Sequence, residues 1–146
     1  MKKIIFLVAD SDCGKSTILS LLKTNLGLKP KGRFFLIKGE KWFIPQMSKD
    51  ELFLDLDGKI DELNLKGYEG ILIGAYQDSI EKAIDIGLKK GLNVSVLYLT
   101  SSLRKTYILD NIIFNKVKKT KVNFIESDSK NIKNNDNAKI LEKLLK

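Results

Sequence analysis

The chain has 146 residues, of which 43% are hydrophobic and 30% charged, with a formal net charge of +8 at pH 7. This length suits a single domain, and the composition excludes a disordered chain. The apolar run "IIFLVA" is shorter than the roughly 20 residues of a membrane helix, so we expect no membrane anchor and no export signal. The only cysteine, Cys13, has no partner for an internal disulfide, which is typical of a cytoplasmic protein.

Two segments at the start of the chain predict a strand followed by a helix. Residues 3–9 are almost continuously apolar, as in a strand that is buried on both faces. From Ser16 onward, leucine and isoleucine recur at helical spacing, and Gly27 follows the last of them. This pattern predicts a helix that ends at a glycine, with a loop between the strand and the helix.

The next segment, "RFFLIKGEKWFIPQ", contains two short aromatic and β-branched runs around "KGEK" and predicts a hairpin or an extended piece. Trp42 and Phe43 either pack in the core or stack on a nucleic-acid base. Ser48 and Glu51 then form a possible capping box ahead of leucine and isoleucine at helical spacing, which predicts a helix through residue 63. The stretch "LFLDLD" also alternates like a strand.

The remaining elements alternate between strand and helix. The strands are expected at 70–76, 93–100 and 122–127, and the helices at 79–91, after Ser102, and at 137–145. The polar segment "SDSKNIKNNDN" is expected to be a loop before the last helix. This alternation predicts a single α/β domain over residues 1–146, with a mostly parallel sheet covered by helices on both faces.

The loop in "VADSDCGKST" has the pattern A-x-x-x-x-G-K-S from Ala9 to Ser16, between the first strand and the first helix. Backbone N–H groups at the start of a helix favour a phosphate, the lysine adds a positive charge, and the serine hydroxyl reaches a bound magnesium ion. The predicted cofactor contacts are Asp12, Cys13, Gly14, Lys15, Ser16 and Thr17, with Ser16 also contacting the metal.

The residues "ADSDCGKST" resemble the phosphate loop of the P-loop NTPase superfamily, and the likeness covers residues 3 to about 26. Chain length and element order are most similar to the small P-loop kinases, such as nucleotide, shikimate and polynucleotide kinases. The resemblance implies a P-loop fold that binds ATP or GTP with Mg²⁺. It also implies transfer of the γ-phosphoryl group to a hydroxyl or phosphate of a small-molecule or nucleic-acid acceptor.

The other catalytic candidates beside Lys15 are Asp55 and Arg104. Asp55 would act as base or metal contact if residues 52–56 form a strand, and would be a surface charge if they form a helix. Arg104 would bend toward a phosphate. No aspartate ends "GILIGAY", the natural place for a second magnesium carboxylate.

A competing interpretation is a non-catalytic or regulatory nucleotide-binding module that contacts nucleic acid. Residues 104–146 contain 11 Lys or Arg and 5 Asp or Glu, a net +6, so the first 103 residues carry +2. A basic segment attracts nucleic acid, although a solvated lysine-rich surface explains it equally well. The acceptor, the base preference and the oligomeric state stay open.

Overall fold

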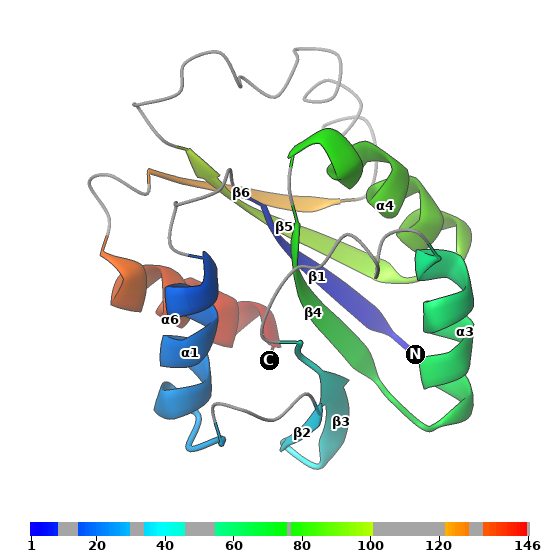
Figure 1. The fold of residues 1–146 in the computed structure, drawn as a ribbon, viewed down its shortest axis with the longest axis horizontal. Helices are drawn as coiled ribbons and strands as arrows, with labels where there is room; N and C mark the ends of the chain where they lie inside the picture. The colour runs from blue at the N-terminus through cyan, green and yellow to red at the C-terminus, as the bar shows by residue number, and fades with distance from the viewer. Residues whose placement is uncertain are drawn as a thin grey trace.

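The computed structural model describes residues 1–8, 15–29, 34–45, 55–75, 77–100, 122–128 and 133–145 (Figure 1). Within them, strands and helices alternate along most of the chain. Their bounds are β1 Lys3–Val8, α1 Lys15–Asn25, β2 Phe34–Ile37, β3 Glu40–Phe43, α3 Leu56–Leu65, β4 Gly70–Ala75, α4 Gln77–Lys89, β5 Asn93–Thr100, β6 Asn123–Asp128 and α6 Asn134–Leu145.

The strands form one six-stranded sheet in the order β2-β3-β4-β1-β5-β6. The β2–β3 pair is antiparallel, and every other neighbouring pair is parallel. The predicted α/β domain with a mostly parallel sheet is therefore confirmed. In the part of the chain that the structure describes, no helix is long and apolar enough to cross a membrane.

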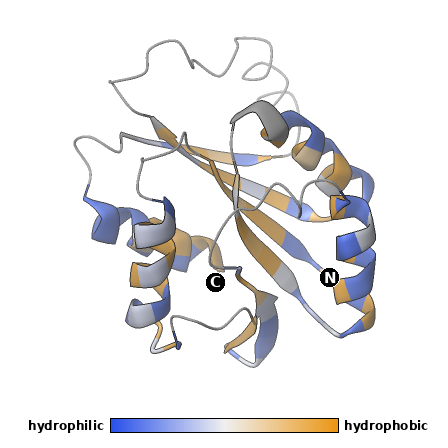
Figure 2. Ribbon diagram, viewed as in Figure 1, coloured by the Kyte–Doolittle hydropathy of each residue, from blue (hydrophilic) through white to orange (hydrophobic). Residues whose placement is uncertain are grey.

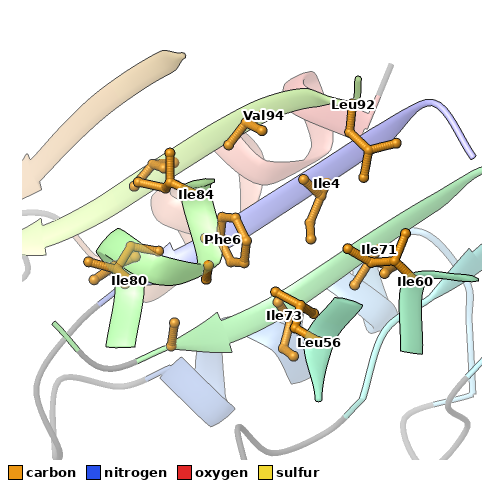
Figure 3. Packing of buried hydrophobic residues seen from close by; sticks show 14 of the residues in the cluster. Ile4, Phe6, Leu56, Ile60, Ile71, Ile73, Ile80, Ile84, Leu92 and Val94 are labelled. Atoms are coloured by element: carbon orange, nitrogen blue, oxygen red, sulfur yellow. The ribbon is translucent and has the colours of Figure 1, made fainter. Parts of the chain in front are cut away.

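Helices cover both faces of this sheet, as predicted. Successive residues of β1 alternate between two cores: Ile4 and Phe6 pack under α3 and α4, whereas Ile5 and Leu7 pack under α1 and α6. Figure 3 shows the first of these cores from close by, and Figure 2 shows the apolar strands between the two helix layers. Each fully buried side chain of this size contributes about 1.5–3 kcal/mol, which explains the unbroken apolar run at residues 4–8.

Two helices begin earlier than the sequence predicts. Helix α4 begins at Gln77 and α6 at Asn134, two and three residues earlier than expected. The end of the polar segment predicted as a loop thus forms the first turn of α6, where asparagine and the acidic Asp136 suit a helix N-terminus. The predicted capping box at Ser48 and the predicted helix after Ser102 lie outside the described residues.

The predicted hairpin is confirmed, and Trp42 on its second strand belongs to the core. β2 and β3 are joined at Lys38 and Gly39, which both have positive φ angles, 52° and 78°. Trp42 on β3 is 0% exposed. The alternative in which Trp42 stacks on a nucleic-acid base is therefore wrong, because the indole has no solvent-accessible face.

One charged residue of α1 lies inside the core beside the hairpin. The side chain of Lys23 is 0% exposed, and its Nζ lies 5.1 Å from the centre of the Phe35 ring. Burial lowers the pKa of Lys23, because desolvation disfavours the ammonium form. The cation–π contact offsets part of this cost.

Replacement of Lys23 by methionine is expected to remove the part of the pH dependence of stability that this lysine causes. Since the folded-state pKa of Lys23 is lowered, the unfolded chain binds more protons between that pKa and the ordinary value of about 10.4, so wild-type stability rises with pH across this window. Methionine keeps the unbranched stem and does not titrate. Urea denaturation should therefore show a smaller gain in stability from pH 7 to pH 10 for Lys23→Met than for the wild type. An equal gain in both proteins would contradict this expectation.

Candidate phosphate-binding site

Helix α1 begins beside the carboxyl ends of two neighbouring parallel strands. Val8 ends β1, Ala75 ends β4, and the two residues are paired in the sheet. The Nζ of Lys15, the first residue of α1, donates a hydrogen bond to the carbonyl oxygen of Ala75 at 3.4 Å. The lysine side chain therefore lies at the carboxyl edge, where β1 and β4 end.

The chain leaves these two strand ends toward opposite faces of the sheet. β1 is followed by α1, which packs with α6 on one face, whereas β4 is followed by α4 on the other. Neighbouring strands whose helices diverge in this way leave a crevice outside their carboxyl ends, and ligands of open α/β sheets bind there. The Nζ of Lys15 lies at this point of the fold, hydrogen-bonded to the last residue of β4.

The first turn of α1 suits an anion. It contains no acidic residue, unlike the first turns of α3 and α6, which contain Asp57 and Asp136. The positive end of the helix dipole and the N–H groups of the first turn therefore meet no carboxylate within the helix. Ser16 and Thr17 are exposed in this turn, so both hydroxyls are accessible from solvent. Phosphate is one of the anions that such a helix start binds.

Several predicted contacts cannot be placed. Asp12, Cys13 and Gly14 lie outside the described residues, as does Arg104. The structure thus brings Lys15, Ser16 and Thr17 together at one helix start, and it does not place the rest of the predicted loop.

Asp55 caps a helix and does not end a strand. It precedes α3 as its N-cap, and its Oδ1 accepts a hydrogen bond from the backbone N–H of Gly58 at 3.1 Å. Leu56 is the first residue of this helix, so the interpretation of residues 52–56 as a strand that ends beside a site carboxylate is wrong at Leu56. Asp57 forms an ion pair with Lys90 at the end of α4. The carboxylate of Asp55 already accepts a hydrogen bond from a helix N–H, so its role in this structure is to cap α3.

Carboxylates are scarce at the described strand ends next to Lys15. β1 ends in Val8 and β4 in Ala75. Among the described residues, no group of three or more His, Cys, Asp or Glu side chains is placed to hold a metal ion. Any magnesium bound at this edge would thus draw its ligands from hydroxyls, bound phosphates, water or residues outside the described ranges.

Sequence reasoning missed the contact between Lys15 and Ala75 and the capping role of Asp55. The first depends on β4 lying beside β1, which no local pattern encodes. The second did have a local signal: an aspartate directly before a run at helical spacing is a common N-cap, but the Ser48 capping box was preferred.

No protein-family model and no curated protein matches this chain. Among solved structures, the fold is similar to the solution NMR structure of a de novo designed PLOOP2X3_50 fold protein, with a TM-score of 0.64 and 16% identity over 99% of this chain and 92% of that chain. A second de novo designed protein, also solved by NMR, gives a TM-score of 0.63 and 15% identity over 99% of this chain and 90% of its own. At these identities the likeness concerns the fold alone.

Proposed function

We propose that this chain binds a Mg–nucleoside triphosphate, ATP or GTP, with its phosphates at the start of α1, and transfers the γ-phosphoryl group to a hydroxyl or phosphate acceptor. The observation that carries the proposal is the position of Lys15, whose Nζ lies 3.4 Å from the carbonyl oxygen of Ala75, at the carboxyl edge where β1 and β4 end side by side. A cation at that point, beside the N-terminus of α1, is what a triphosphate requires.

Each described group has a defined task in this proposal. The ammonium of Lys15 would exchange its long hydrogen bond with Ala75 for charge-assisted bonds to the β and γ phosphates, which are roughly twice as strong as neutral ones. The hydroxyl of Ser16 would contact the magnesium ion, whose other ligands would be phosphate oxygens and water. The N–H groups of the first turn would bind phosphate oxygens.

A second candidate is a nucleotide-binding module without phosphoryl transfer, acting as a regulatory protein that contacts nucleic acid. Two observations favour it: β4 ends in Ala75 where a magnesium carboxylate would be expected, and the carboxylate of Asp55 caps α3. Transfer needs a group that positions the acceptor or the metal, whereas binding needs only the cradle.

Two assays separate these candidates. Melting curves with Mg²⁺ alone, with Mg–ATP and with Mg–GTP test the site they share, and a triphosphate in hundredfold excess over its dissociation constant should stabilise the fold by about 2.7 kcal/mol. ADP or GDP release is then measured with nucleosides, small alcohols and oligonucleotide ends as acceptors. Acceptor-dependent release supports the kinase. Stabilisation without release, joined by salt-sensitive oligonucleotide binding, supports the module. Absence of any shift with either triphosphate would overturn both.

A further inference from the structure

The outer edge of β2 exposes apolar side chains on a strand that ends the sheet. β2 is an edge strand of the sheet, and no described residue pairs with its outer side. Phe34 is 50% exposed and Leu36 is 64% exposed, whereas Phe35 and Ile37, which alternate with them along the strand, are buried. The strand is "FFLI", with no charge or proline. Natural edge strands usually carry a charged residue or a proline, which prevents pairing with another chain.

The backbone of the same two residues points outward. The carbonyl oxygen of Lys41, which is paired with Leu36, accepts a hydrogen bond from the N–H of Glu69 at 2.8 Å, so Lys41 turns its backbone away from β2. In an antiparallel ladder both residues of such a pair point away from each other, and the pattern repeats every second residue. The N–H and C=O groups of Leu36 and Phe34 therefore face the open edge.

The exposed side chains share one face of the hairpin. The ring of Phe34 contacts that of Tyr68 edge-on at 6.1 Å, on the face that α3 covers. Leu36 lies on this face too, because alternate residues of a strand point to the same side. The edge thus presents two apolar side chains together with main-chain groups that pair with no other described residue, which is what an added strand needs.

We propose that a second copy of this chain pairs with the outer edge of β2. The two β2 strands would run antiparallel about a two-fold axis at Phe35, so that Phe34 of each copy lies opposite Leu36 of the other. Each Phe34–Leu36 pair then exchanges both main-chain hydrogen bonds and buries both exposed side chains. A self-complementary patch of this kind is the requirement of a two-fold interface. The sheet continues from one copy into the other.

Charge and size set the behaviour of this dimer. Each copy carries a net charge of +8, so the two copies repel each other at low ionic strength. The Nζ of Lys41 lies 4.8 Å from the centre of the Phe34 ring and 4.3 Å from that of Tyr68, which places a cation beside the interface. Added salt therefore strengthens the dimer. A patch of one four-residue strand is smaller than a stable interface of roughly 1,200 Å², so the dimer is weak.

Sedimentation equilibrium at about 10 µM to 1 mM, the range of weak association, tests this pairing. The wild type should dimerise, and more tightly as NaCl is raised. Leu36→Lys, which places a lysine on the edge, should weaken dimerisation by about tenfold or more, since 1.4 kcal/mol already gives that factor. The matched control is Leu65→Lys: Leu65 is 88% exposed at the end of α3, and its replacement should leave dimerisation unchanged.

A readout on the wild type removes the dependence on variant folding. The amide protons of Phe34 and Leu36 should exchange more slowly with solvent as protein concentration rises, while the amide of Phe35, which faces β3, should not change. A monomer at every concentration, a dimer that Leu36→Lys does not weaken, or association that weakens with salt would each overturn the proposal. The last outcome would point to an oppositely charged partner surface instead.

Discussion

Replacement of Gly70 by alanine is expected to lower the free energy of unfolding by about 3 kcal/mol, at the upper end of the usual overpacking cost. A Cβ at Gly70 would lie 2.5 Å from two carbon atoms of the Trp42 ring, and real Cβ atoms do not approach so closely. The ring cannot move aside cheaply, because it is fully buried and its strand is paired with β4 at Gly70 itself. The bulk of Trp42 thus requires a glycine opposite it.

Urea denaturation of wild type and Gly70→Ala measures this cost. Gly67→Ala is the control. A Cβ at this position meets no atom within 4 Å, so the alanine is strained only by the positive φ of 81°. It should lose about 1–2 kcal/mol. Trp42→Leu should itself be less stable than the wild type. In that background Gly70→Ala should lower the free energy of unfolding far less than in the wild type, because the effects of substituting two residues in contact are not additive. Equal costs in both backgrounds would show that the ring is not the cause.

Lys15→Ala is expected to abolish most of the stabilisation that Mg–ATP or Mg–GTP confers. If the lost bonds to phosphate weaken binding a hundredfold, about 2.7 kcal/mol, then a triphosphate at 100 times the wild-type dissociation constant still adds about 0.4 kcal/mol to the variant. The hydrogen bond from Lys15 to Ala75 is long, at 3.4 Å, so its loss should cost the fold without ligand little.

Melting curves of Lys15→Ala with and without triphosphate test this expectation. Lys89→Ala is the matched control, because Lys89 is an exposed lysine in the last turn of α4 and should keep the full shift. Ser16→Ala should lose only the part of the shift that depends on magnesium, which a series with and without EDTA isolates. A shift that survives in Lys15→Ala would place the triphosphate elsewhere on the molecule.

Local pattern was sufficient for the central strands and for α1. A strand buried on both faces must be apolar at nearly every position, and residues 3–8 and 70–75 are recognisable for that reason. The helical spacing after Ser16 and the glycine at 27 likewise predict α1. The N-cap of α3 was not predicted, because the sequence analysis sought the start of a helix at the Ser48 capping box and gave Asp55 no capping role.

The sequence by itself determined the class of fold and the residues that start α1, because burial and capping leave local marks in composition and spacing. Only the tertiary structure decided the order of the strands, and with it the contact between Lys15 and Ala75. It also placed Trp42 against Gly70 and left β2 at an edge. These depend on which distant segments pair, and pairing is selected by the packing of the whole core, which no short stretch of residues encodes.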